Sequence, residues 1–253
     1  MLFDTHAHYD DDAFDDDRDE LLAVLPSKGV GLIIDPGCTV VSSRASIALA
    51  ERYDHVYSAV GVHPEEIGTL TDSSLDEILA LAKHPKCVAV GEIGLDYYWD
   101  DTHKAEQKAL FRAQLEMALT LDKPVIIHDR EAHGDCLEIV REYEGLRGVF
   151  HCYSGSVEMA RELLRRGWYL GFDGPITYKN ARKAIEVLEL CPTDRILIET
   201  DSPYLSPVPM RGKRNDSSNL QFVVKKIAEV KGISEEEICA VTAANGKRLF
   251  NII

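Results

Sequence analysis

Short apolar runs alternate with longer amphipathic segments along the whole of this 253-residue chain. The runs are rich in valine and isoleucine, as buried strands are, and helical periodicity follows several of them, for example at 39–53, 104–121 and 157–166. Strands that alternate with helices predict parallel pairing with right-handed crossovers. The eight candidate strands are residues 1–4, 30–35, 56–61, 88–92, 125–128, 148–151, 168–172 and 196–201.

Eight such units ordinarily close into a barrel. We therefore predict an α/β fold, a (β/α)8 TIM barrel that forms a single domain over residues 1–253. Two further helices are predicted at 219–231 and 234–250, and Ser234 and Glu237 have the spacing of a capping box at the start of the second. We expect these helices to complete the outer ring.

Composition narrows the class of protein. Hydrophobic residues make up 45% of the chain and charged residues 28%, which is ordinary for a globular domain. No apolar run approaches the roughly 20 residues that cross a bilayer, and the first residues lack the pattern of a secretory signal. We expect a cytoplasmic protein without a membrane role. The acidic stretch 10–17 is interpreted as a solvated loop before the first helix.

The formal charge of −15 comes from 28 basic and 43 acidic side chains, so the molecule should repel a polyanion at long range. A wide groove along long nucleic acid is therefore disfavoured. A small anion, or the end of a strand, fits if metal ions supply the local positive charge.

Cysteine usage excludes two further classes. The six cysteines show no C-x-x-C spacing, which argues against a disulfide framework and against a structural zinc site. We expect most of them to be buried, reduced packing residues.

Polar side chains end five of the eight predicted strands, at the side where barrel enzymes carry catalytic groups. Two histidines after the first strand lie two residues apart and so point to the same side of an extended chain. One histidine in such a place is better explained as a hydrogen-bonded core residue, but an unpaired cluster would be costly to desolvate, and metal ions remove that cost. The candidate ligands are His6, His8, Glu92, His128, His151 and Asp201.

Six ligands exceed what one four-coordinate zinc uses, so we predict two divalent cations. His6, His8 and Asp201 would hold one ion, and the histidines that end the fifth and sixth strands would hold the other. Glu92 would bridge the two ions. A water held between the ions would then be the nucleophile, because coordination lowers its pKa towards about 7. Asp201 could instead serve mainly as the base, and the sequence leaves both roles open.

Ligand type restricts the metal only loosely. Imidazole favours Zn, Mn, Fe, Co or Ni, whereas Mg prefers oxygen ligands, and the identity stays open. Asp4 and Glu199 each lie two residues before a proposed ligand and face the same way, so each is a candidate partner of a ligand or a member of a salt bridge inside the barrel.

Further residues are candidates for substrate binding. His63 follows the third strand and could donate to a phosphate or a carbonyl, or be an ordinary loop histidine. Arg130 follows His128, and Arg211 and Arg214 flank Lys213 after the eighth strand. These cations could neutralise phosphate charge near the metals, or form a solvated basic loop.

The chain resembles the TatD family of metal-dependent hydrolases over essentially its whole length. Six motifs occur in the family's order, and RGKRN at 211–215 and TAAN at 242–245 also match. The six are DTHAH at 4–8, GVHP at 61–64, GEIGLDYY at 91–98, VIIH at 125–128, HCYSG at 151–155 and ETDSPY at 199–204.

The resemblance implies a TIM barrel of the metallo-dependent hydrolase type and deoxyribonuclease activity that removes nucleotides from a 3′ end. The family's metal ligands fall on the same six residues, and its phosphate-side histidine falls on His63. Two departures, at 129–132 and 216–218, lie in loops near the predicted site and put substrate preference in doubt.

Three functions compete. The leading one is metal-dependent hydrolysis of phosphodiester bonds in DNA, with single strands or 3′ ends as substrate, a monomer as the acting form, and Glu92 and Asp201 as the catalytic groups. The alternative enzyme is a small-molecule amidohydrolase or lactonase, because the same cluster would polarise a carbonyl. A non-catalytic metal-binding scaffold is the third, but no proposed ligand is missing.

Overall fold

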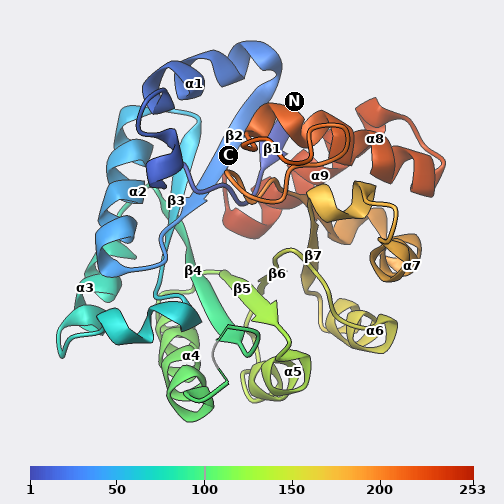
Figure 1. The fold of residues 1–253 in the computed structure, drawn as a ribbon. Coiled ribbons are helices and arrows are strands. Elements are labelled where there is room, and N and C mark those ends of the chain that lie inside the picture. Colours follow the sequence, from blue (N-terminus) through green and yellow to red (C-terminus); the bar gives the residue numbers. More distant parts are fainter. Residues whose placement is uncertain (100) are drawn as a thin grey trace.

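The computed structural model describes residues 1–99 and 101–253. Eight parallel strands follow one another in sequence order and form a nearly closed barrel, with helices outside it (Figure 1). This confirms the predicted (β/α)8 fold. The strands are β1 Leu2–Asp4, β2 Val30–Pro36, β3 Val56–Val60, β4 Cys87–Asp96, β5 Val125–Arg130, β6 Gly148–Phe150, β7 Tyr169–Phe172 and β8 Ile196–Ile198.

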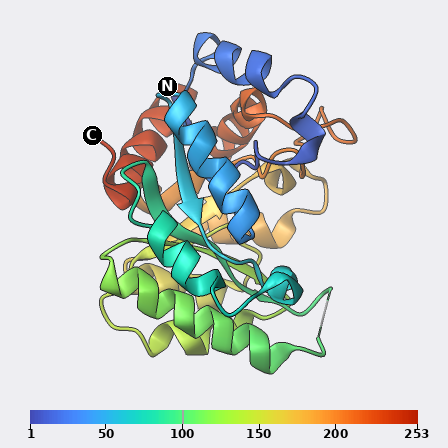
Figure 2. The ribbon, with the colours of Figure 1, turned by 90° about the vertical axis from the view of Figure 1, so that its left-hand side faces the viewer.

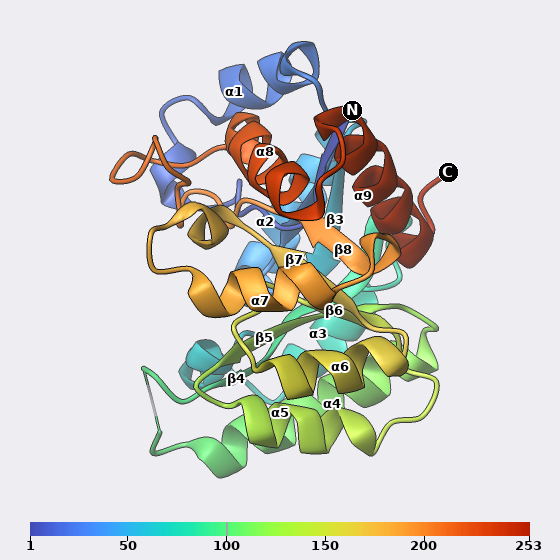
Figure 3. The same cartoon turned by 90° about the vertical axis from the view of Figure 1, so that its right-hand side faces the viewer.

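Helices follow the strands and cover the outside of the barrel, where α5, α6, α7 and α8 lie side by side in Figure 3. The two chain ends lie near each other, because the last helix packs against β1 and β8 (Figure 2). The helices are α1 Arg18–Val24, α2 Val40–Arg52, α3 Ser74–Leu81, α4 Lys104–Thr120, α5 His133–Arg141, α6 Val157–Arg165, α7 Arg182–Leu190, α8 Leu220–Lys231 and α9 Glu235–Phe250.

The barrel closes between β8 and β1 through single hydrogen bonds, and we call this junction the seam. Thr5 N donates to the Ile198 carbonyl at 3.1 Å, and Asp201 N donates to the His6 carbonyl at 2.9 Å. The seam therefore sets two candidate ligands, His6 and Asp201, next to each other although they come from opposite ends of the chain.

The strand β4 is longer than predicted, and a glycine explains why it continues. Gly94 has φ +151°, and a Cβ there would lie 1.9 Å from the His128 carbonyl oxygen. Only a residue without a side chain permits this approach of β4 to β5. The pairing then continues to Asp96, which lies opposite Arg130.

Two local predictions can be compared with the structure. Ser234 caps α9 by accepting a hydrogen bond from Glu237 N, as its spacing predicts. The acidic stretch is only partly a solvated loop, because it contains the short 3-10 helix η1 (Asp12–Phe14), whose Phe14 is fully buried. Burial of that ring fixes the stretch against the barrel rim.

All six cysteines are free thiols, as predicted, but only half of them, Cys87, Cys136 and Cys191, are buried, where we expected most to be. Within 1–99 and 101–253 no helix is long and apolar enough to cross a membrane.

Candidate active site

The strand-end residues meet at the carboxyl end of the barrel, around a cavity of about 880 Å³. His6 lies beneath the cavity floor and is fully buried. Five of the six candidate ligands border the cavity, together with two of the candidate substrate residues. These seven are His8, Glu92, His128, His151, Asp201, His63 and Arg130.

One carboxylate oxygen of Glu92 faces the first group of ligands. His6 Nε2 and His8 Nε2 lie 3.0 Å apart, and Glu92 Oε2 lies 3.3 and 3.6 Å from them. Asp201 Oδ1 lies 3.6 Å from His6 Nε2 and 3.5 Å from His8 Nε2. Four potential ligand atoms, from the ends of β1 and β8 and from within β4, thus lie close together.

These spacings fit a cation. Ligands about 2.05 Å from a tetrahedral zinc are separated by about 3.3 Å, and the five distances above run from 3.0 to 3.6 Å. Two imidazole nitrogens and two carboxylate oxygens are also a donor set that zinc, manganese, iron and cobalt accept. The residues present therefore suit a divalent metal ion.

The other oxygen of Glu92 faces a second group. His128 Nδ1 lies 2.8 Å, His151 Nε2 3.2 Å and His63 Nε2 3.7 Å from Glu92 Oε1. The Glu92 carboxylate thus lies between two sets of imidazoles, as a bridging ligand would. His63, Glu92 and His128 offer ligand atoms close enough to hold a metal, as do His6, His8 and Glu92.

Three of the imidazoles are oriented by a partner on the ring nitrogen that faces away from the Glu92 carboxylate. His128 Nε2 donates to Asp96 Oδ2 at 2.9 Å, and His8 Nδ1 donates to the Pro36 carbonyl at 3.1 Å. Such partners fix the ring and leave its other nitrogen for a metal.

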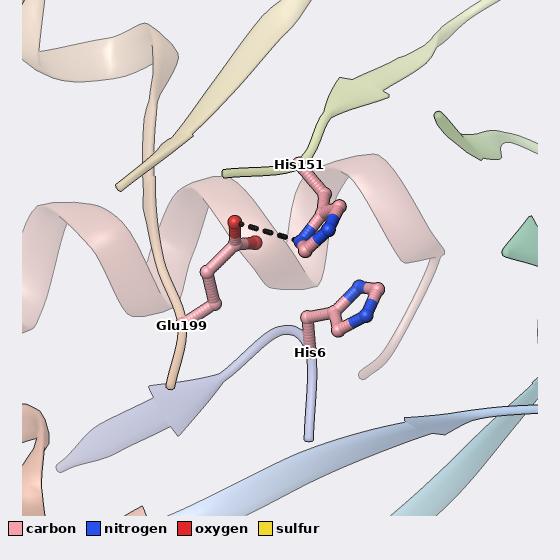
Figure 4. A group of neighbouring side chains, drawn as sticks. All are labelled: His6, His151 and Glu199. Carbon is pink, nitrogen blue, oxygen red and sulfur yellow. Dashed lines mark ion pairs between the residues drawn. The ribbon is translucent and has the colours of Figure 1, made fainter. Parts of the chain in front are cut away.

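The third ring belongs to His151, whose Nδ1 lies 3.3 Å from Glu199 Oε1 in an ion-pair contact and makes no hydrogen bond to the described residues (Figure 4). The same oxygen accepts a hydrogen bond from Cys152 N, and Gly171 has no Cβ to occupy the space of the Glu199 carboxylate. Figure 4 also shows the His6 ring beside the His151 ring, with centroids 3.8 Å apart. Glu199, one of the two candidate ligand partners, thus contacts a ligand, and His6, His151 and Glu199 form a third group with metal-ligand spacing.

Asp4, the other candidate partner, contacts backbone and hydroxyl groups instead of a ligand ring. Its Oδ2 accepts hydrogen bonds from Thr200 Oγ1 and Ser217 Oγ, both at 2.6 Å, and its Oδ1 accepts from His6 N and Thr200 N. Burial raises the pKa of Asp4 to about 7 despite these donors. Asp4 therefore strengthens the seam.

The charges of the site are tightly linked. Burial alone would raise the pKa of Glu92, but the imidazoles of His6, His151 and His63 hold it well below its usual range. Burial likewise opposes the charge on His128, yet hydrogen bonds to Asp96 and Glu92 raise its pKa to about 9. Without metal, a proton occupies the His128 nitrogen that faces Glu92.

The imidazole of His63, unlike that of His128, is neutral. Its Nδ1 accepts a hydrogen bond from Glu65 N at 3.3 Å, and burial together with His128 lowers the pKa of His63 to about 3. A neutral ring that accepts at Nδ1 carries its hydrogen on Nε2. His63 therefore presents a donor towards the cavity.

The structure separates the three candidate arginines. Arg130 borders the cavity, whereas Arg211 and Arg214 are not among the residues that line it. Arg211 lies over the Tyr178 ring at 4.5 Å. Arg214 donates to both oxygens of Asp17, at 2.7 and 2.6 Å, and so holds the acidic stretch.

Three acids at strand ends escaped the sequence prediction. Asp96 ends β4, Asp35 lies near the end of β2, and Asp173 follows β7; none is more than 3% exposed. Burial raises the pKa of Asp35 and of Asp173 well above the usual range. Asp35 and Asp173 come at the end of an apolar run, and that position was the signal that could have revealed them.

Comparison with known proteins agrees with a metal-dependent hydrolase. A sequence profile described as TatD related DNase matches residues 3–251. The chain is 43% identical to the uncharacterized metal-dependent hydrolase YabD of Bacillus subtilis, over the full length of both. It is 36% identical to the 3′-5′ ssDNA/RNA exonuclease TatD of Cronobacter sakazakii, covering 98% of this chain and 97% of that protein.

Among solved structures, the chain is similar to YjjV, a TatD homologue from Escherichia coli K12, with a TM-score of 0.94 and 32% identity. The superposition covers 100% of this chain and 98% of the other.

Proposed function

Given that this chain belongs to the TatD family of metal-dependent hydrolases, we propose that it hydrolyses phosphodiester bonds of nucleic acid and removes nucleotides from a 3′ end. The main support is the position of the Glu92 carboxylate, which lies between two sets of imidazoles at the floor of an open cavity. The exonuclease relative of Cronobacter sakazakii supports the choice of reaction.

We assign six residues to the metal centre: His6, His8, Glu92, His128, His151 and Asp201. Divalent cations held by these residues would supply the charge that polarises a phosphoryl oxygen and lowers the pKa of water. The protein's own contribution is to hold the rings in place, through Asp96, Glu199 and the Pro36 carbonyl, so that no reorganisation is needed when substrate binds.

Asp201 has a second role in this proposal. Neighbouring His8, His151 and His6 outweigh the effect of burial and lower the pKa of Asp201, so its carboxylate is ionised at neutral pH. It borders the cavity and can accept the proton that the attacking water loses. Water is thereby activated at the edge where substrate enters.

His63 and Arg130 would contact the substrate. His63 offers its Nε2 hydrogen to a phosphate oxygen, and Arg130 supplies positive charge at the cavity rim. Because the charge of the whole chain is −15, a strand would be drawn in at its end and not along a long basic groove.

A substrate panel tests the function. Metal-free protein is reloaded in turn with each of several divalent ions and incubated with single-stranded DNA and RNA carrying a label at the 3′ or the 5′ end. We expect early release of the 3′-labelled nucleotide, and stepwise shortening of the 5′-labelled strand.

Lactones and amides run in parallel as alternative substrates. If they are cleaved while DNA and RNA stay intact with every metal, the nuclease proposal is wrong and the small-molecule alternative holds. If nothing reacts although the protein binds metal, a scaffolding role replaces catalysis.

A further inference from the structure

Two large aromatic side chains, Tyr98 and Trp99, lie exposed next to each other at one side of the cavity. Tyr98 is 57% exposed and Trp99 is 63% exposed, and they lie two and three residues after Asp96, the buried last residue of β4. Their rings meet edge to face, with centroids 4.9 Å apart, and Trp99 borders the cavity. Neighbouring aromatic rings left in water beside a binding site are typical of a surface that a ligand covers.

A guanidinium completes this surface. Arg130 extends from the end of β5 and lies 4.1 Å from the Tyr98 ring centroid and 5.4 Å from that of Trp99. Among the described residues that line the cavity, Arg130 is the one lysine or arginine. We call Tyr98, Trp99 and Arg130 the aromatic rim.

The aromatic rim is fixed relative to the metal centre. Tyr98 N and Trp99 N both donate to Asp96 Oδ1, at 2.8 and 3.0 Å, while Asp96 Oδ2 accepts from His128 Nε2 at 2.9 Å. One carboxylate therefore positions a metal ligand with one oxygen and the aromatic turn with the other. A group bound at the rim keeps a defined position relative to the reacting phosphate.

We propose that the aromatic rim stacks a nucleobase of a single-stranded nucleic acid while a nearby phosphate occupies the metal centre. This rests on the proposed nuclease function and specifies how that site selects its substrate. Inside a duplex both faces of a base are covered by its neighbours, so an internal base can lie on Trp99 only when it is unpaired and unstacked.

Charge explains why stacking is needed. Other parts of the cavity wall carry the acids Asp10, Asp11, Glu65, Glu66 and Glu131. Most nucleic-acid sites obtain their affinity from many basic side chains that displace counterions, and this cavity lacks them over its described lining. Stacking is not electrostatic, and it changes affinity by about 5-fold to 150-fold per base. Binding should therefore depend less on salt than binding to a long basic groove does.

The test uses abasic oligonucleotides. Single-stranded DNA of one sequence is prepared with one abasic nucleotide placed in turn at each position near the 3′ end, and KM is measured with the metal-loaded protein. We expect one position at which loss of the base raises KM by about 5-fold or more. In Trp99→Ala the KM for intact DNA should rise by a similar factor, and the abasic penalty at that position should disappear, because a double-mutant cycle isolates the contact.

Two variants control for general damage. Trp99→Phe keeps an aromatic face and should restore most of the lost affinity. Tyr204→Ala removes the ring of Tyr204, which is 53% exposed and borders the same cavity, and it should leave the abasic penalty in place. Metal content is measured for each variant, so that loss of the centre is recognised.

Tryptophan fluorescence gives a readout that needs no cleavage. Only Trp99 is exposed, since Trp168 is 2% exposed, so stacking should quench emission when single-stranded DNA is added. Trp99→Phe should abolish this quenching.

The outcomes separate the two proposals. If wild-type protein cleaves DNA but Trp99→Ala keeps its KM and its abasic penalty, the rim inference is wrong and the nuclease proposal stands. If Tyr204→Ala alone removes the penalty, the base lies elsewhere in the cavity and the rim inference is equally wrong. If wild-type protein cleaves no nucleic acid, both proposals fall.

Discussion

The two halves of the metal centre share Glu92 but hold their other ligands differently. In the half around Glu92 Oε2, His6 is fully buried and His8 donates to a neutral backbone carbonyl. In the half around Glu92 Oε1, His128 and His151 face carboxylates, Asp96 and Glu199, with their outer nitrogens. A carboxylate partner makes an imidazole more basic, towards a proton as well as towards a metal. The second half should therefore respond more strongly to changes outside the ligand set, at Asp96 and Glu199.

Removal of the Glu92 carboxylate should weaken both halves together, and we expect it to cause the largest loss of activity. We expect Glu92→Ala to lower kcat/KM by at least about three orders of magnitude, because both ions lose a shared ligand. Metal content, measured by mass spectrometry, should fall for both ions while circular dichroism shows an intact barrel. Glu92→Gln is the matched control for shape. Full activity in Glu92→Ala would remove the bridging role.

A change at Asp96 should affect one half only. Asp96→Asn keeps the volume but weakens the hydrogen bond to His128, and loss of such a partner typically costs about 10-fold to 100-fold in metal affinity or activity. Titration with metal should show one site weakened and the other unchanged. Asp135→Asn is the control, since Asp135 bonds the Tyr97 hydroxyl and Lys108 and contacts no ligand ring. Equal weakening of both sites by Asp96→Asn would contradict the division into halves.

The pH dependence of the metal-free protein tests how Asp96 acts on His128 in the second half. The folded protein raises the pKa of His128 from 6.5 to about 9, because its hydrogen bonds to Asp96 and Glu92 outweigh burial. The charged ring therefore contributes stability that is complete below pH 6.5 and is lost as pH rises towards about 9. Metal must displace this proton, so affinity at the second half should increase over the same window.

Urea unfolding of chelator-treated protein, from about pH 6 to about pH 9.5, measures the effect. In Asp96→Asn the loss of stability should be smaller, because the partner that stabilises the charged ring is weakened. A flat profile in the wild-type protein would show that the ring is neutral without metal.

The smallest expected effect concerns Arg214. The sequence placed this cation beside the substrate, whereas the structure sets it against Asp17 in a half-exposed ion pair. We expect Arg214→Ala to change KM for DNA by less than about 2-fold and to lower the free energy of unfolding by less than about 1 kcal/mol. A rise in KM of much more than about 2-fold in Arg214→Ala would return Arg214 to the substrate site.

The sequence predicted the fold because each strand is a short β-rich run bounded by helical periodicity. It also identified the candidate ligands, because the polar residue after an apolar run marks the barrel end. Asp96 was missed for a specific reason: β4 was expected to end at Glu92, and a fully buried strand lacks the alternation that would reveal four more residues. The pairing of Gly94 with His128 that extends the strand is a tertiary contact.

The partner of each side chain could not be derived from spacing. Asp4 and Glu199 have the same relation to a ligand in sequence, yet Asp4 binds hydroxyl and backbone groups while Glu199 contacts His151. The three candidate arginines differ in the same way. The sequence does not reveal that Arg214 pairs with Asp17 while Arg130 borders the cavity. Residue types were therefore predictable, and their contacts were not.

The position of the seam means that a cation in the half around Glu92 Oε2 would also affect the stability of the barrel. A cation held by His6 and Asp201 would join the two edges of the barrel across the seam, where no regular strand pairing connects β8 to β1, and the chain between these residues contains strands β2 to β8. Such a cross-link closes one of the longest loops the molecule can form, much as a disulfide staple would, and restricts the unfolded chain accordingly. The ion in that half would therefore stabilise the closed barrel as well as take part in catalysis.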